Sequence, residues 1–168
     1  MLNKKIEKAI NKQINAEIWS AYFYLSMSAY LEDNGLPGFA NWMKNQWKEE
    51  LAHAMKFFDY VNERGGRVVL EPIAKVPKEW KNPVHIMEET LKHEREVTSL
   101  INSLTDLAIK EKDHATNNLL QWFIAEQVEE EATVGEILNK LKMIGGKGHA
   151  MLMIDKELGS RVFVEETI

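Results

Sequence analysis

Apolar residues recur at helical spacing along four long stretches of the chain, and short runs of glycine, asparagine and proline separate these stretches. Glycine pairs and an Asn-Gly step are typical of helix ends, and an Asn-Pro step suits a helix start. The pattern predicts long helices from about Asn3 to Asp33, from Pro37 to Gly65-Gly66, from Asn82-Pro83 to about Lys112 and from Asp113 to Gly145-Gly146, then a short amphipathic helix near His149–Leu158.

The connections between these helices have unequal lengths, and the lengths predict the topology. Tight turns make the first and second helices antiparallel neighbours, and likewise the third and fourth. Residues 67–81 lack a helical period and contain two prolines. An extended segment of about 16 residues reaches roughly 55 Å, more than the roughly 42 Å of a 28-residue helix. It can therefore run the whole length of the bundle before the third helix starts.

We accordingly predict an all-α fold: a four-helix bundle with one long crossover connection and a short fifth helix at the C-terminal end. One domain is expected over residues 1–168, with the bundle at about 3–144 and the last helix at about 148–158. Residues 18–25 are apolar nearly all round, which predicts burial on more than one face and hence an oligomer.

Composition excludes several classes of protein. The 168 residues contain no cysteine, which excludes disulfide frameworks, zinc fingers, rubredoxin-type iron sites and iron–sulfur clusters. The formal net charge of −5 gives no basic footprint for nucleic acid. No apolar stretch resembles a signal peptide or a membrane span, so no membrane partner and a cytoplasmic location are expected.

Each of the four long helices carries one glutamate where an apolar residue belongs. At seven-residue spacing along the core-facing lines, the sequence places Glu17 between Ile10 and Tyr24, Glu50 between Met43 and Phe57, Glu94 between Met87 and Ile101, and Glu130 between Phe123 and Ile137. A single such glutamate is usually a long side chain that reaches water. Four of them, one per helix and each near the middle, are hard to obtain by chance and indicate a polar layer inside the core.

Buried carboxylates on this scale require cations. Burying one ionised carboxylate costs several kcal/mol, and four together repel one another and raise their pKa values. His53 lies one turn after Glu50, so both side chains can reach one point. Two divalent ions would balance the four carboxylates and a neutral imidazole. Oxygen-rich ligation favours iron or manganese over copper, and zinc is usually held with more nitrogen or sulfur.

At these residues the sequence resembles the non-haem ferritins of bacteria and archaea. The likeness covers essentially the whole chain and includes NAEIWSAYFYLSMSAY, KEELAHAMKFFDYVNERGG, LKHEREVTSLI and LLQWFIAEQVEEE. It implies a ferritin-like bundle that assembles into a 24-subunit cage, oxidises Fe(II) with oxygen or hydrogen peroxide at a di-iron ferroxidase centre, and stores ferric mineral. Glu17, Glu50 and His53 would hold the first iron, and Glu50, Glu94 and Glu130 the second.

The resemblance also implies roles for residues around the iron pair. Gln127 matches a position that hydrogen-bonds near the centre, and Tyr24 matches a tyrosine that supplies an electron. Glutamates on the flanks would form a third iron site, which in this sequence means Glu49, Glu126 and Glu129. Without the resemblance, such a run is more often a solvated acidic face.

Departures from related families narrow the prediction. Leu51 stands where bacterioferritins carry a haem-ligating methionine, so no haem is expected. The fourth helix lacks a second Glu-x-x-His, which di-iron oxygenases tend to carry. A di-iron oxidase without storage and a metal-free scaffold remain the alternatives. The remaining histidines, predicted to be surface residues, are His85, His93, His114 and His149.

Overall fold

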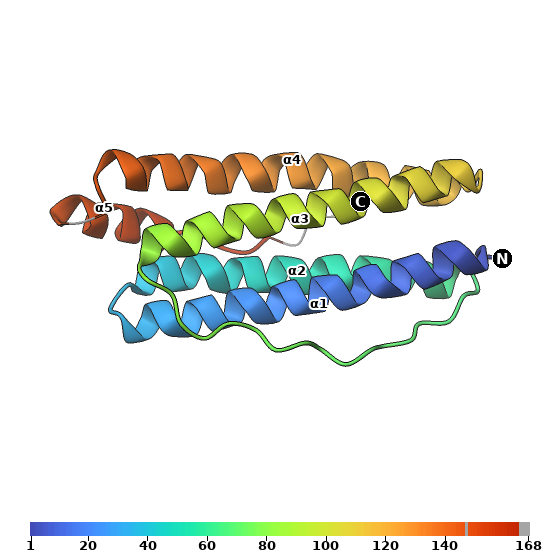
Figure 1. Cartoon of the computed structure of the whole chain (residues 1–168), viewed down its shortest axis with the longest axis horizontal. Coiled ribbons are helices and arrows are strands. Elements are labelled where there is room, and N and C mark those ends of the chain that lie inside the picture. Colours follow the sequence, from blue (N-terminus) through green and yellow to red (C-terminus); the bar gives the residue numbers. More distant parts are fainter. Residues whose placement is uncertain (147, 165–168) are drawn as a thin grey trace.

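In the part of the chain that the structure describes, four long helices lie side by side, and a short fifth helix lies at one end of the bundle (Figure 1). The computed structural model describes residues 1–146 and 148–164. The helices are α1 (Lys4–Asp33), α2 (Pro37–Glu63), α3 (Pro83–Lys110), α4 (His114–Met143) and α5 (His149–Leu158). The predicted all-α fold is confirmed, whereas the domain limits stay a prediction and include residues outside the described part. No helix in the described ranges is long and apolar enough to cross a membrane.

The helix starts follow from side-chain caps. The side chains of Asn3, Asn82 and Asp113 each accept a hydrogen bond from a backbone amide of the first turn, which satisfies a donor that the helix leaves unpaired. Gly35 and Gly65 follow the ends of α1 and α2 with φ of 73° and 68°, a left-handed backbone that glycine adopts without strain.

The crossover between α2 and α3 runs the length of the bundle along α1, as its reach predicts (Figure 1). Polar side chains at intervals along α1 donate hydrogen bonds to backbone carbonyl oxygens of the crossover. These bonds take the place of the backbone partners that a helix or sheet would provide. These bonds are Asn11 to Arg67 O (3.0 Å), Asn15 to Glu71 O (3.0 Å), Ser26 to Pro77 O (2.7 Å) and Tyr30 to Trp80 O (2.6 Å).

The crossover also covers part of the apolar surface of α1. Trp80 is buried, and its ring lies 6.4 Å from that of Phe23 and 5.4 Å from that of Tyr30. Phe23 in turn stacks on Trp19 at 5.0 Å. Much of the second apolar environment predicted for residues 18–25 is therefore provided within the chain. That stretch does not by itself require a neighbouring subunit, although Tyr22 remains 52% exposed.

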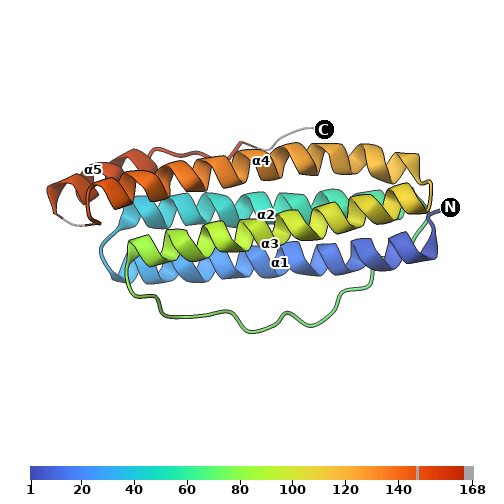
Figure 2. The same ribbon diagram turned by 45° about the horizontal axis from the view of Figure 1, so that its top comes forward.

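α5 is fixed to the start of α2 by a close backbone contact. A Cβ atom at Gly38 would lie 1.6 Å from the Asp155 carbonyl oxygen, so only glycine fits there. The Asp155 carboxylate accepts a hydrogen bond from the Phe39 amide at 2.9 Å. Beyond α5, residues 159–164 turn back along the bundle towards its middle (Figure 2).

The apolar core of the described residues is divided into two clusters along the bundle. One lies towards the α5 end and includes Phe39, Met87 and Leu141, and the other lies at the opposite end and includes Ile10 and Phe57. The four core-line glutamates occupy the layer between them. The fold therefore places a polar layer in the middle of an otherwise apolar interior.

Candidate metal centre

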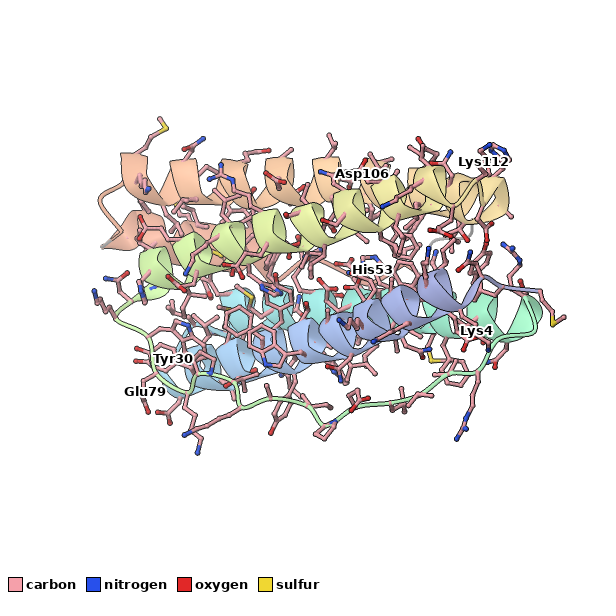
Figure 3. The ribbon with its side chains drawn as sticks, turned by 45° about the vertical axis from the view of Figure 1, so that its right-hand side comes forward. Lys4, Tyr30, His53, Glu79, Asp106 and Lys112 are labelled. Atoms are coloured by element: carbon pink, nitrogen blue, oxygen red, sulfur yellow. The ribbon has the colours of Figure 1, made fainter. Side chains whose placement is uncertain are left out.

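The polar layer is almost fully shielded from solvent. Its six predicted residues are at most 6% exposed: Glu17, Glu50, His53, Glu94, Gln127 and Glu130. Figure 3 shows the labelled His53 inside the bundle, with Lys4 and Lys112 at one end. Buried carboxyl groups at this density need partners, because water cannot reach them to solvate their charge.

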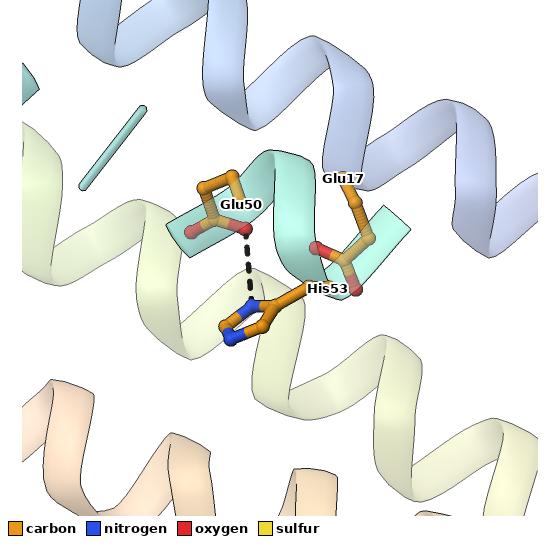
Figure 4. A group of neighbouring side chains, drawn as sticks. All are labelled: Glu17, Glu50 and His53. Carbon is orange, nitrogen blue, oxygen red and sulfur yellow. Dashed lines mark ion pairs between the residues drawn. The ribbon is translucent and has the colours of Figure 1, made fainter. Parts of the chain in front are cut away.

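The structure brings three predicted ligands from two helices to one point (Figure 4). Ligand atoms of Glu17 on α1 and of Glu50 and His53 on α2 all lie within 4.8 Å of one another, a spacing that suits a metal ion. His53 Nδ1 is 3.6 Å from Glu50 Oε2, because residues three apart lie on the same helix face.

Two carboxylate oxygens at this point have no hydrogen-bond partner in the part of the chain that the structure describes. Glu17 Oε2 and Glu50 Oε2 are these buried atoms, whereas Glu17 Oε1 accepts from Gln13 Nε2 at 2.8 Å. Nearly all buried polar atoms in proteins are paired, so two orphan oxygens that face one imidazole are suited to binding a cation. The donor set, two carboxylates and one imidazole, fits iron.

Glu94 on α3 and Glu130 on α4 lie on the other side of the layer, and each is held by neighbouring side chains. The Tyr24 hydroxyl donates to Glu94 Oε1, and Gln127 Nε2 donates to Glu94 Oε2 at 3.2 Å. Gln46 Nε2 donates to Glu130 Oε2 at 2.9 Å. These bonds leave oxygen lone pairs available on both carboxylates.

Burial raises the pKa of all four carboxyl groups when no metal is bound. It raises the pKa of Glu17 to about 7 and that of Glu50 well above its usual value, with the nearby Glu94 charge adding to both effects. The pKa values of Glu94 and Glu130 are also raised, again chiefly by burial. The layer therefore holds protons that a metal ion would displace.

The same burial keeps His53 and Tyr24 uncharged. It lowers the pKa of His53 to about 4, with the Lys56 charge as a smaller cause, so the imidazole is neutral and able to bind metal. Burial raises the pKa of Tyr24 well above 10, and the charges of Glu94 and Glu50 add to this. Tyr24 therefore keeps its hydroxyl proton as a donor to Glu94.

The three residues predicted for a third iron site are not equivalent. Glu49 and Glu126 line a small pocket that also contains His53, and both are half-buried. Glu129 is exposed and is not among the residues lining that pocket. Glu49 also forms an ion pair with Arg161, with 2.7 Å between Glu49 Oε2 and Arg161 Nη2.

The prediction that His93 is a surface residue is wrong. Its Nε2 lies 2.7 Å from Ser20 Oγ, and its ring packs against Phe23 and Tyr24 at 5.2 and 5.9 Å. Burial lowers its pKa to about 4. The residue before Glu94 is turned about 100° from it, which directs His93 towards α1. His114 and His149 are exposed, and His85 is half-buried.

Sequence reasoning missed three residues that support the carboxylates. Gln13 and Gln46 each lie four residues before a core-line glutamate and are at most 4% exposed. An amide on a core line one turn from a glutamate is a signal that could have identified them. Arg161 gives no such signal, because it lies 112 residues from Glu49 in sequence.

Comparison with known proteins shows which family the chain belongs to. A family model described as a ferritin-like domain matches residues 7–144. The chain belongs to the ferritin family. A bacterial non-heme ferritin of Bacteroides fragilis strain 638R is 46% identical over 161 residues, which cover 96% of this chain and 100% of that one.

Solved ferritin structures share the fold closely. A ferritin of Archaeoglobus fulgidus, engineered into a closed form, is 52% identical and superposes with a TM-score of 0.96 over 98% of this chain and 100% of its own. An open pore ferritin of the same archaeon gives a TM-score of 0.94 at 52% identity, over 96% of this chain and 98% of its own. The ferritin bundle predicted from the sequence is therefore confirmed.

Proposed function

We propose that this ferritin stores iron: it oxidises Fe(II) to Fe(III) at a di-iron ferroxidase centre and deposits ferric mineral inside an oligomeric cage. The observation that carries the proposal is the pair of orphan oxygens on Glu17 and Glu50, buried beside a neutral His53. The non-haem ferritin names of its relatives and its membership of the ferritin family support the same function.

Iron is the substrate and cargo of this centre. Glu17, Glu50 and His53 would bind one Fe(II), and Glu50 would share a second with Glu94 and Glu130. As Fe(II) enters, these carboxyl groups would release the protons that burial lets them keep. Carboxylate oxygens also favour the higher charge of Fe(III), which assists the loss of an electron from each ion.

Oxygen or hydrogen peroxide would accept the electrons. Tyr24 is placed to take part, because its hydroxyl is hydrogen-bonded to Glu94 and its ring is fully buried. Gln127 and Gln46 would keep Glu94 and Glu130 in position while the ions bind and leave. Glu49, Glu126 and Glu129 would form a third site through which Fe(III) passes towards the cavity of the 24-subunit cage that the family resemblance implies.

Replacement of two of the predicted ligands, the shared Glu50 and Glu94 of the second iron, tests the proposal. We expect Glu50→Ala and Glu94→Ala to abolish fast Fe(II) oxidation, measured by stopped-flow absorbance of ferric iron. The apo Glu50→Ala variant should be at least as heat-stable as the parent, because it loses a buried acid whose ionisation the neighbouring carboxylates oppose. Glu71→Ala, which removes an exposed glutamate on the crossover, is the matched control.

Two outcomes would contradict the assignment. Parental initial rates in both variants would remove the ferroxidase centre from this layer. A protein that oxidises iron but retains only about two ions per chain after prolonged loading would be a di-iron oxidase without storage, since a storage cage retains a large excess over its binding sites.

A further inference from the structure

The segment after α5 brings a permanent positive charge to the edge of the metal centre. The Arg161 guanidinium donates from Nη2 to Glu49 Oε2 at 2.7 Å and from Nη1 to Gln46 Oε1. It also lies over the Trp42 ring, 4.6 Å from the centroid. The guanidinium has only donor atoms, so it can pair with carboxylate and amide oxygens but cannot itself bind a metal ion.

The backbone of Arg161 is held as firmly as its side chain. Its carbonyl oxygen accepts hydrogen bonds from Asn41 Nδ2 at 3.0 Å and Asn45 Nδ2 at 3.2 Å, both on α2. Asn45 is buried, and Asn41 is half-buried. The guanidinium is therefore positioned by α2 and does not depend on a freely moving chain end.

A chain of two hydrogen bonds joins Arg161 to a predicted iron ligand. Gln46 accepts from Arg161 through Oε1 and donates through Nε2 to Glu130 Oε2 at 2.9 Å. Arg161 thus fixes which way the Gln46 amide points, because the oxygen faces the guanidinium and the nitrogen must face the carboxylate.

The same segment borders the pocket that would take a third ion. Phe163 and Val164 line it together with Glu49, Glu126, His53 and a second basic residue, Lys56, whereas Arg161 reaches it only through Glu49. Glu49 and Arg161 side chains are 21% and 24% exposed, so their ion pair is only partly screened by water. A cation that binds Glu49 in this pocket meets a carboxylate already paired with a cation of the protein.

We propose that Arg161 is an internal competitor for the third metal position: its guanidinium pairs with Glu49 in the metal-free protein, and a divalent cation must displace it to bind there. This inference rests on the proposed function, and it adds Arg161, which lies outside the bundle, as a residue that sets the affinity of the third position for metal ions. Arg161 would keep the third position weaker than the pair, so that ions enter the pair first and pass on without being trapped.

Binding of a redox-inert ion tests the inference without relying on catalysis. We would titrate Zn²⁺ into the apo cage at pH 7 by isothermal calorimetry and count ions per chain. In Arg161→Met, which keeps an apolar stem over Trp42 but removes the charge, we expect the ion that follows the first two to bind about fivefold to tenfold more tightly. Arg161→Lys, which keeps the charge, should remain close to the parent.

Two further variants separate this effect from a general change in charge. Arg67→Met removes the same charge from the exposed start of the crossover and should leave every affinity unchanged. Adding Glu49→Gln to Arg161→Met should abolish the gain, because the carboxylate that both cations share is then absent.

The outcomes distinguish a failure of the Arg161 inference from a failure of the proposed function. If the first two Zn²⁺ ions bind normally and the later affinity is the same in the parent, Arg161→Met and Arg67→Met, the inference is wrong and the iron pair stands. If the parent binds no pair of ions at all, the proposed function is wrong and the inference falls with it.

Discussion

Replacing Glu17 by glutamine should stabilise the apo protein, and the gain should depend on pH. Burial raises the pKa of Glu17 from 4.5 to about 7, so the folded chain binds this proton more tightly than the unfolded chain does. The proton's contribution to stability is complete below pH 4.5 and is lost as the pH rises through about 7. Glutamine keeps the shape of the protonated acid and can still accept the bond from Gln13, but it never ionises.

The size of the effect follows from the same pKa. At about 1.4 kcal/mol per pKa unit, ionisation of Glu17 costs the folded chain less than about 1 kcal/mol at pH 5 and roughly 3 kcal/mol at pH 8. For a chain of this length, 1 kcal/mol corresponds to about 2–4 °C, so Glu17→Gln should raise Tm by roughly 6–12 °C at pH 8 and only slightly at pH 5.

Differential scanning calorimetry of chelator-treated protein at both pH values measures this difference. Glu96→Gln, an exposed glutamate on α3, is the matched control and should change Tm little at either pH. A gain for Glu17→Gln that is equal at pH 5 and pH 8, or a loss at pH 8, would refute the reasoning that the buried carboxyl is held protonated.

Three other predictions address the third site, the assembly and the helix caps. Glu49→Ala combined with Glu126→Ala should leave oxidation of the first two irons per chain fast while changing later turnover. An unchanged number of irons bound per chain and an unchanged turnover would contradict the third site. Size-exclusion chromatography with light scattering should give a particle far larger than the 19.4 kDa chain, and a dimer at both low and high salt would argue against a cage. Asp113→Ala should cost about 1–3 kcal/mol in urea unfolding because it removes the α4 cap and the Arg64 pair, whereas Asp113→Asn should cost less because it keeps the cap. Burial would raise the pKa of Asp113, but hydrogen bonds from Arg64 and the Thr116 amide lower it below its usual value of 3.8. The contribution of the charged Asp113 to the free energy of unfolding should therefore be lost only as the pH falls below about 3.8.

The sequence predicted what depends on local chemistry. Caps and glycine signals located the helices to within two residues or so at most ends, because each cap is satisfied within its own first turn. The seven-residue lines identified Glu17, Glu50, Glu94 and Glu130, because a charge on a core line is conspicuous whatever the exact angle of each helix.

The parts that could not be predicted depend on how the elements pack. Glu49 and Glu129 lie on flanks of their helices, and which flank faces the centre depends on the rotation of each helix within the bundle. The structure leaves Glu129 exposed for this reason. Trp80 and Arg161 approach α1 and α2 from irregular segments, where no periodicity indicates the direction of a side chain.

The long crossover determines at what stage of folding the set of predicted metal ligands becomes complete. It divides the molecule into two hairpins, and the acidic layer is shared between them: α1 and α2 supply Glu17, Glu50 and His53, and α3 and α4 supply Glu94 and Glu130. Each hairpin can form from contacts between neighbours in sequence, which favours rapid folding. Neither hairpin contains the complete set of predicted ligands, so two ions can be bound only after the hairpins have docked in register. Bound iron would then stabilise that docking by mass action, and reactive Fe(II) would find no complete site on a chain that is only half folded.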